Sequence, residues 1–449
     1  MNRAFTTIIV AVTLVCGASA SAQDTRVITF QEAIRIALDQ NGTLKQAENA
    51  AELGQVDVKA ARQQFLPDLQ VAVRGSESYG RNFDSGEGRI VDQNTTNATI
   101  GVSSGVVLFD GFGNTATLKA AEFNRDASTL DLQRSRETIA FTVATNYLVL
   151  ISQQEQLQVQ RENLSAQAAL EQQIQTYVDA GARTIADLYQ QQASVASAKL
   201  AVVNGERATK LAEVDLMQTL QLDPHGTYEF EAPAFGSLYP ATTELDLPSL
   251  LTRAYAQRAD IVAGQARVDA AGQNVRVARS GHWPTVSLSA GYDTAYTSAA
   301  DLPFSDQIDQ RQGGSIGLGV SIPIFDRGSA SVATRRAEIQ QQNAQIDLET
   351  LQNDVGLQVR RAHLDLEAAH EQLAAAQAQQ KSAELALQVT QDRYQAGAAT
   401  LVELTQSRAT QVDAASSVVT ARYNEMFQRT LIGYYIGALD PGKLAGESP

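Results

Sequence analysis

The chain consists of two related halves. Residues near 31 to 224 recur near 247 to 441, and matching positions lie about 217 residues apart. Pro67, which ends an apolar helix-like segment in the first half, corresponds to Pro284 in the second. A duplicated unit of this length restricts the architecture more than any single residue does, so each motif is interpreted as one of a pair.

The repeat divides the chain into segments. We expect a signal peptide at 1–22, a first repeat at 23–224, a linker at 225–247, a second repeat at 248–441 and a C-terminal tail at 442–449. Each repeat is predicted to contain a helix, two strands, a long helix, a tight turn and a returning helix. The two turns are predicted at 178–183 and 395–399.

The N-terminal segment has the pattern of a secretory signal. Arg3 precedes an apolar run from Phe5 to Val15, and small residues follow as far as Ala22. The run is too short to span a bilayer, and no later stretch approaches ~18 uninterrupted apolar residues. The one cysteine, Cys16, lies in this segment, and the valine before it disfavours a lipid anchor. A mature chain without thiols forms no disulfides, which suits a periplasmic or cell-surface location.

The formal net charge is -15. A nucleic-acid partner is therefore not expected, because such a chain would not neutralise phosphates. The acidity is explained either by solubility or by a negatively lined passage that favours cations.

Four short stretches alternate between apolar and polar residues with the period of two that a β-strand requires. They lie at 68–79, 96–109, 284–297 and 313–325. In the last stretch Ile316, Leu318 and Val320 alternate with glycine and serine, and in the second Val106 and Leu108 belong to the apolar set. The alternating part of each stretch is about ten residues long, the length of a tilted strand that crosses a membrane.

Polar, breaker-rich loops at 80–88 and 299–306 connect the strands of each pair. Tyr79, Tyr292 and Tyr296 lie near the loop ends, where a membrane barrel carries an aromatic belt. An ordinary soluble sheet with one wet face is the alternative. The rest of the chain is helical, however, and supplies no second layer to cover four apolar faces, so membrane strands are favoured.

The remainder is rich in Ala, Gln, Leu and Glu at helical spacing. Apolar residues from Leu348 to Ala376 recur at steps of three and four, as in a coiled-coil seam. One helix can run unbroken over about 112–177, and another over about 329–394, each on the order of 100 Å long. Asp110 and Asp326 are placed to cap these helices.

The helices at about 31–65 and 248–282 and the returning helices at about 184–221 and 400–437 are shorter than the long ones. We therefore expect one helix of each kind to stack end to end alongside a long helix.

Four strands cannot close a barrel, and open sheet edges are not tolerated in lipid, so the chain must oligomerise. Two chains would supply about eight strands and a filled interior, whereas three would supply about twelve and leave a bore. A helical tube on the order of 100 Å long is useful only beneath an open bore. The expected fold class is therefore α+β, with four strands per chain that complete a twelve-stranded trimeric barrel above a coiled-coil tunnel.

The sequence resembles the outer-membrane factor family, the TolC-like channels. The resemblance covers the mature chain and rests on the duplicated halves, on Phe109-Asp110-Gly111 and Phe325-Asp326-Arg327 after the second strand of each half, and on a Tyr/Gly/Thr/acid-Leu turn at each tip. It implies a homotrimer in the bacterial outer membrane, with its barrel in lipid and its helical tunnel in the periplasm. It also implies docking with a periplasmic adaptor protein and an inner-membrane transporter of the RND, ABC or MFS class.

The resemblance further implies that the helical tips form the gate. Acidic rings that narrow the periplasmic mouth in the family correspond here to Asp187 and Glu403 and, one turn further, to Gln190 and Gln406. Three copies of Glu403 around one axis would repel one another and attract cations. The alternative is that Glu403 is a solvated helix-end charge, and Gln406 makes the inner ring weaker or uncharged.

The family also ties its closed mouth with polar links between neighbouring coils. Asp187 and Tyr394 occupy two of these positions, but Ala399 lies where an arginine is expected, which predicts a mouth that opens more easily. The surface that meets the adaptor is expected at Gly181, Ala182, Gly397 and Ala398. The two glycines are also explained by turns that need positive φ.

Enzymatic motifs do not emerge, and no catalytic residues, cofactor or metal are expected. His363, Glu367 and His370 share a helical face, but they flank the coiled-coil seam, where polar residues are normal. The competing class of function is a structural or adhesive coiled-coil surface protein. That alternative explains the helices and leaves four alternating strands without a role.

Overall fold

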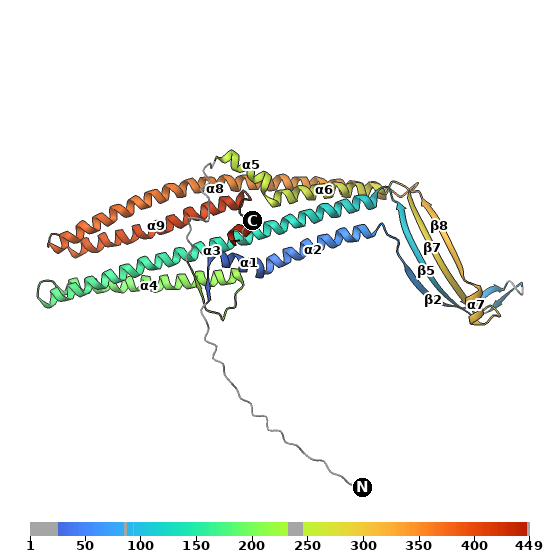
Figure 1. Ribbon diagram of the computed structural model, residues 1–449, viewed down its shortest axis with the longest axis horizontal. Coiled ribbons are helices and arrows are strands. Elements are labelled where there is room, and N and C mark those ends of the chain that lie inside the picture. The colour runs from blue at the N-terminus through green and yellow to red at the C-terminus, as the bar shows by residue number, and fades with distance from the viewer. Residues whose placement is uncertain (1–25, 85–87, 93, 232–245, 447–449) are drawn as a thin grey trace, which may run out of the picture.

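The structure is a computed structural model that describes residues 26–84, 88–92, 94–231 and 246–446. A rod of long helices carries a curved β-sheet at one end, and two helical hairpins form the other end (Figure 1). The predicted signal peptide, Cys16 and most of the predicted linker lie outside the described residues.

The first half contains ten elements within the described residues: β1 (Arg26–Ile28), α1 (Phe30–Gln40), α2 (Gly42–Gln63), β2 (Gln70–Ser78), β3 (Arg81–Asp84), β4 (Arg89–Asp92), β5 (Thr95–Phe109), α3 (Gly113–Asp179), α4 (Ile185–Leu220) and β6 (Tyr228–Phe230). The second half contains α5 (Leu247–Gln257), α6 (Ala259–Ser280), β7 (Thr285–Thr297), α7 (Phe304–Gln310), β8 (Gly313–Ser321), α8 (Ser329–Gln395), α9 (Leu401–Tyr435) and α10 (Pro441–Leu444).

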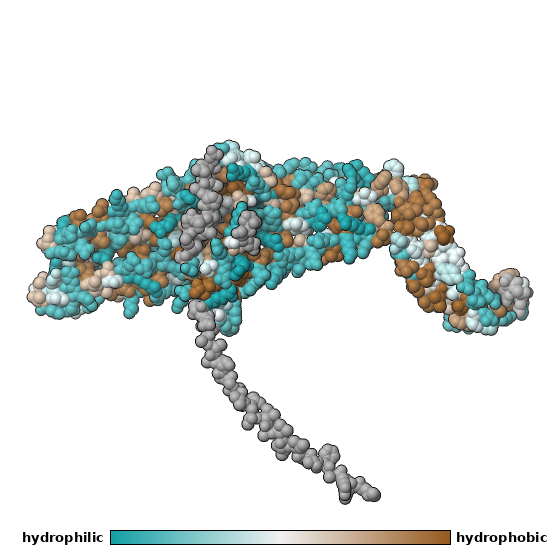
Figure 2. Space-filling model, in the orientation of Figure 1, coloured by the Kyte–Doolittle hydropathy of each residue, from teal (hydrophilic) through white to brown (hydrophobic). Residues whose placement is uncertain are grey.

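The main sheet has the strand order β2-β5-β7-β8, and every neighbouring pair is antiparallel. One row of partners runs Val71, Val102, Tyr292 and Gly314 across all four strands. Apolar side chains on this face are exposed, and Figure 2 shows the sheet as an apolar region beside a mostly hydrophilic rod. β2 and β8 are the two edges, and neither is closed by a further strand of the main sheet.

The strand ends and the loops differ from the sequence-based expectation. β8 ends at Ser321 and not at 325, because Pro323 has no N–H to donate to a ladder. The register shifts between Val107 and Phe109, so Phe109 is the residue that pairs with Val286, and the simple alternation through Leu108 is wrong.

Both connecting loops contain secondary structure. The first carries the β3–β4 hairpin, and the second carries α7. Gln307 of α7 is fully buried, and its side-chain amide donates to the carbonyl of Leu302 (2.7 Å) while its Oε1 accepts from the N–H of Thr297 (2.9 Å). One glutamine thus fixes the loop against the end of β7.

The long helices α3 and α8 each contain 67 residues, and α4 and α9 return antiparallel to them. Asp110 and Asp326 accept hydrogen bonds from the backbone N–H groups of Asn114 and Ala330, both at 2.6 Å. The two aspartates therefore cap these helices although Phe112 and Gly328 directly precede the first turns.

The shorter helices that lead to the sheet are not continuous. Asn41 separates α1 from α2, and its Oδ1 accepts from the N–H groups of Thr43 (2.9 Å) and Leu44 (3.2 Å). Arg258 is likewise extended (φ −66°, ψ 121°) and separates α5 from α6, but its side chain does not cap α6. Continuous helices over 31–65 and 248–282 are therefore wrong, because an extended residue interrupts each one.

The largest hydrophobic core lies in the middle of the rod. Here α1, α3 and the ends of α4 and α9 surround a short parallel pair, β1 and β6. Tyr147 is fully buried, and its hydroxyl lies 3.1 Å from the carbonyl oxygen of Ile28. None of the helices in the described ranges combines the length and the hydropathy needed to cross a membrane.

Candidate functional site

Two tight turns form the free ends of the helical hairpins. Gly181 and Gly397 have φ of 72° and 74°, the left-handed region that glycine reaches without strain. A Cβ on either residue would meet no atom within 4 Å, and Ala182 and Ala398 beside them are exposed. The predicted adaptor-contacting residues are thus accessible in one chain.

The two acids of the predicted gate take part in matching helix caps. The N–H of Thr184 donates to Asp187 Oδ2 at 3.3 Å, and the N–H of Asp187 donates to Thr184 Oγ1 at 3.3 Å. At the other tip the N–H of Thr400 donates to Glu403 Oε2 at 2.7 Å, and the N–H of Glu403 donates to Thr400 Oγ1 at 3.2 Å. Both are capping boxes, so each acid stabilises the start of its returning helix.

The hydrogen bond from the Thr400 N–H lowers the pKa of Glu403, and the Thr400 hydroxyl and the charge of Arg393 act in the same direction. Glu403 is therefore ionised at neutral pH. It remains exposed, so a carboxylate that caps a helix is also available to ions.

Tyr394 lies between the two tips. Its side chain is 3% exposed, and the guanidinium carbon of Arg183 is 4.7 Å from its ring centroid. Burial raises the pKa of Tyr394; the charge of Arg183 opposes this effect and that of Asp187 adds to it. The Tyr394 hydroxyl is buried and has no hydrogen-bond partner among the described residues.

Arg183 was not among the site residues predicted from the sequence. Ala399, where an arginine was expected, is buried beside Leu401 and Leu404, and the cation that reaches Tyr394 comes from the other hairpin. The internal repeat could have indicated this arginine, because Arg183 occupies in the first repeat the position that Ala399 occupies in the second.

An apolar cluster holds the two hairpins together behind these polar groups. Leu170 and Ile174 of α3 and Leu188 of α4 pack with Tyr394, Leu401 and Leu404 of the second hairpin. Gln190 and Gln406 are exposed. The neighbouring Gln191 is fully buried and donates to the Gln167 carbonyl at 2.9 Å, so it belongs to the helix packing.

Closer to the middle of the rod, polar contacts join α3 to α9. Glu155 accepts from the Tyr423 hydroxyl at 2.7 Å and pairs with Arg422 at 3.3 Å. Gln156 donates to the Ser416 carbonyl at 2.8 Å. The two hairpins are thus connected both at the tip and near the middle.

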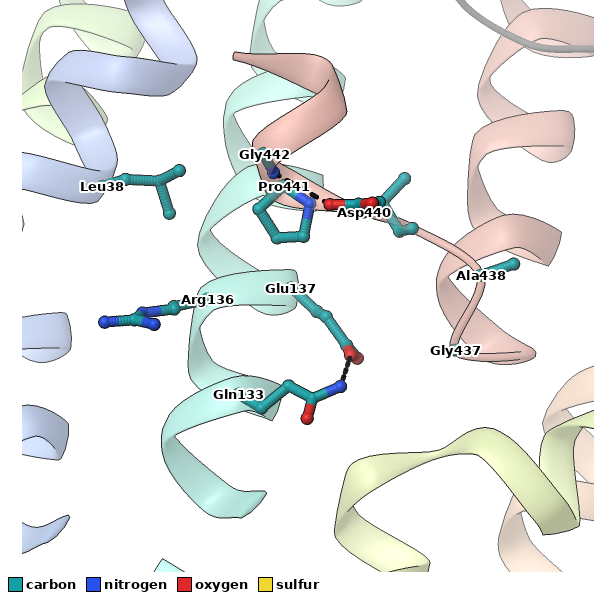
Figure 3. A pocket seen from close by; sticks show the side chains of 10 residues that line it. Leu38, Gln133, Arg136, Glu137, Gly437, Ala438, Asp440, Pro441 and Gly442 are labelled. Carbon is teal, nitrogen blue, oxygen red and sulfur yellow. Dashed lines mark hydrogen bonds between the residues drawn. The ribbon is translucent and has the colours of Figure 1, made fainter. Parts of the chain in front are cut away.

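A polar cavity of about 700 Å³ lies near the middle of the rod, between α1, α3 and the segment that follows α9. Figure 3 shows Leu38, Arg136 and Glu137 on one side and the chain from Gly437 to Gly442 on the other. Gln133 donates to Glu137 at 3.2 Å, and Arg134 forms an ion pair with the same carboxylate at 2.9 Å. These groups satisfy one another.

The side chains of His363, Glu367 and His370, which share one helical face, do not meet at a common point. His363 lies 3.7 Å from Glu367, whereas His370 lies 3.3 Å from Glu425 of α9. Groups of three potential ligands are not found within the described part of the chain.

A rod of paired helices joined to a sheet with an exposed apolar face is typical of one class of protein, the membrane-inserted β-sheet protein with a helical extension. The chain belongs to the outer membrane efflux protein family, whose model matches residues 33–220 and 250–427. It is a non-enzymatic efflux protein of the outer membrane.

The relatives agree with this assignment. The chain is 26% identical to the outer membrane efflux protein BepC of Brucella suis, with 76% of this chain and 70% of that protein aligned. It is 25% identical to the pyoverdine export outer membrane protein OpmQ of Pseudomonas putida, with 82% and 77% aligned.

Solved structures show the same fold. CusC superposes with a TM-score of 0.79 at 20% identity, with 91% of this chain and 92% of that chain covered. VceC of Vibrio cholerae superposes with a TM-score of 0.79 at 20% identity, with 91% and 96% covered.

Proposed function

We propose that three copies of the chain close a twelve-stranded barrel in the outer membrane above a coiled-coil tunnel, and that this trimer is the exit duct of a tripartite efflux or type I secretion system. The observation that carries the proposal is the open four-stranded sheet with its exposed apolar face. Lipid does not tolerate open sheet edges, so β2 and β8 need partners.

The sheet can close on copies of itself without changing its pattern. β2 and β8 would be antiparallel where two chains meet, because the number of strands per chain is even and each neighbouring pair is antiparallel. A head-to-tail contact of this kind forms a ring when the rotation closes.

The rod has matching apolar surfaces at its two sides. α4 packs on α3, α3 packs on α9 and α9 packs on α8, so α4 and α8 lie at opposite sides of the rod. Exposed apolar side chains on α4 are Ile185, Tyr189, Leu200, Val203, Leu211 and Val214. Those on α8 are Val332, Ile339, Ile346, Leu357, Leu364, Leu385 and Val389. α4 is 36 residues long and covers only the tip half of α8, so packing it against α8 of the next copy would bury Leu364, Leu385 and Val389. In the half beside the sheet, α2 is the edge helix, and its exposed Leu53 and Val56 would face the remaining apolar residues of α8.

Cross-linking tests this closure. A cysteine at Ala72 of β2 is combined with one at Gly313, Gly317 or Ser321 of β8, and the intact protein in outer membranes is treated with a flexible bis-maleimide. We expect covalent dimers and trimers for at least one pair, and no species larger than a trimer. Cross-linked species that extend beyond trimers in a ladder, or none at all, would contradict a closed three-chain ring.

The tips support the proposed gate and docking surface. Glu403 is charged and exposed, and Gly181 and Gly397 carry no covering side chains. In the proposed assembly a periplasmic adaptor contacts the tips, and an RND, ABC or MFS transporter drives the cargo. A structural or adhesive role would leave the protein extractable without detergent, so recovery of intact protein in the aqueous phase would support that alternative.

A further inference from the structure

The polar face of the main sheet carries very small side chains. Across the described strands it is built largely from glycine, serine, alanine and threonine, as in the row Ala72, Gly101, Asp293 and Gly313. The opposite face carries the exposed apolar side chains. In a closed barrel the apolar face contacts lipid, so the small polar face lines the bore.

Two charged residues interrupt this face. β2, β5, β7 and β8 contain three charged side chains, Arg74, Glu77 and Asp293. Arg74 pairs across the ladder with Thr99, and Asp293 pairs with Gly101, which places both on the polar face. Glu77 has the parity of Val71 and Val73 and therefore belongs to the apolar face.

The neighbours leave both charges uncovered. The Asp293 row otherwise holds only alanine and glycine, and the Arg74 row continues with Thr99 and Ala295. A Cβ built on Gly101 would lie 3.0 Å from Cβ of Asp293, so glycine keeps the space beside the carboxylate open. Both side chains are exposed.

The strand order spaces the two charges evenly. Arg74 is on β2 and Asp293 is on β7, with β5 between them, and β8 lies between Asp293 and the next copy of β2. Around a closed trimer an arginine and an aspartate would therefore alternate at every second strand. Two strand spacings and two residue rises put them about 12 Å apart, too far for a direct ion pair.

We propose that Arg74 and Asp293 form an alternating-charge belt that sets the ion selectivity of the membrane-spanning part of the duct. This inference rests on the proposed trimeric barrel and is independent of the helical tips. Because the charges balance, the belt passes ions of both signs and favours zwitterionic solutes, whose two charges match neighbouring wall charges. Neutralising Arg74 leaves a ring of negative charge, and neutralising Asp293 leaves a ring of positive charge.

The size of the effect follows from Coulomb's law. A unit charge about 10 Å away in water alters the local concentration of a monovalent ion about twofold, and salt screens this over a Debye length of about 10 Å at 0.1 M. The belt should therefore matter most at low ionic strength.

The test uses the full-length protein reconstituted in planar bilayers under a potassium chloride gradient at low salt. R74Q should raise the ratio of cation to anion permeability about twofold, D293N should lower it by a similar factor, and the double variant should return it toward the wild-type value. E77Q removes the third strand charge from the opposite face and should leave the ratio unchanged.

A cysteine variant separates charge from folding. D293C should show the D293N selectivity, an anionic thiol reagent should restore the wild-type ratio, and a neutral reagent of equal size should not. Conducting trimers whose selectivity is unchanged in R74Q and D293N would overturn the belt and leave the proposed channel intact. Absence of any conductance in the wild type would overturn the channel itself.

Discussion

Asn41 and Arg258 hold equivalent positions in the two repeats, and each donates a side-chain N–H to a carbonyl at the end of a returning helix. Asn41 Nδ2 lies 3.4 Å from the Thr219 oxygen, and Arg258 Nη1 lies 3.4 Å from the Tyr435 oxygen. Terminal carbonyls of a helix have no partner within it. Each repeat therefore has a side-chain donor where its two shorter helices meet end to end, and this donor is neutral in the first half and charged in the second.

The free energy of unfolding should depend more on the charged junction at Arg258 than on the neutral junction at Asn41. R258M removes the nearest cation of Asp260, leaves only Arg134 at 3.7 Å, and takes the side-chain donor from the Tyr435 carbonyl, so we expect a loss of about 3 kcal/mol in the free energy of unfolding. N41A removes a helix cap and should cost about 1 kcal/mol. Denaturant unfolding of the detergent-solubilised protein measures both, with the exposed Arg253→Ala as the control. Equal losses in R258M and R253A would refute the role of Arg258.

Acid should weaken the same junction. Burial raises the pKa of Asp260, but the hydrogen bond and charge of Arg258 and the charge of Arg134 outweigh it, so the pKa of Asp260 in the folded protein lies below the ordinary value of an aspartate. A depressed carboxylate pKa stabilises the fold above the unfolded pKa, and this contribution is lost as the pH falls through the folded pKa. In D260N the stability curve below about pH 4 should be flatter than in the wild type. Parallel curves would show that Asp260 contributes nothing.

The contact between Arg183 and Tyr394 predicts how firmly the two tips are joined. R183A removes the cation from a largely buried ring, which should cost about 1 kcal/mol of tip association and raise the conductance of reconstituted channels. Y394F keeps the ring and removes a hydroxyl that has no partner, so its conductance should match the wild type. R207A, at an exposed position higher on α4, is the matched control. An R183A conductance equal to that of R207A would exclude the contact as a latch.

Glu403 combines a helix cap with a charge, and two substitutions separate them. E403Q removes the charge, so it should reduce cation selectivity. It keeps an oxygen that can accept from the Thr400 N–H, so the fold should remain stable. E403A removes both and should also lower the stability of the tip by roughly 1 kcal/mol. Reversal potentials under a salt gradient and thermal unfolding give the two readouts. Wild-type selectivity in E403Q would assign the residue to capping alone.

Bulk at the second tip should block export. G397W places a large side chain where the structure has open space, and we expect export to fall at least tenfold while trimers still form, because the tip is the proposed docking surface. G397A introduces the strain of a positive φ without the bulk. Export assays in cells and native gels of membranes distinguish the two effects. Normal export in G397W would remove the tip from the docking surface.

Sequence patterns were sufficient for the elements whose residues interact locally. Alternation identified the four strands of the main sheet because successive side chains of a strand point to opposite faces. Apolar residues spaced by three and four identified the helices α3 and α8, because such residues lie on one face of a helix. The breaks at Asn41 and Arg258 escaped prediction, since neither residue stops a helix by itself.

The candidate site was predictable only where it depended on a short motif. Thr184 with Asp187 and Thr400 with Glu403 have the spacing of capping boxes, so the local geometry was present in the sequence. Arg183 was missed because its partner, Tyr394, is distant along the chain and its contact depends on how the two hairpins pack.

The sequence by itself determined the two-fold repetition, the strands and the lengths of the rods, since these depend on residue spacing along one element. Only the tertiary structure decided which elements lie side by side. The order β2-β5-β7-β8 puts Arg74 and Asp293 on alternate strands, and the packing of two hairpins brings Arg183 to Tyr394. These relationships arise between residues remote in the chain, where packing and charge act through space and not along the backbone.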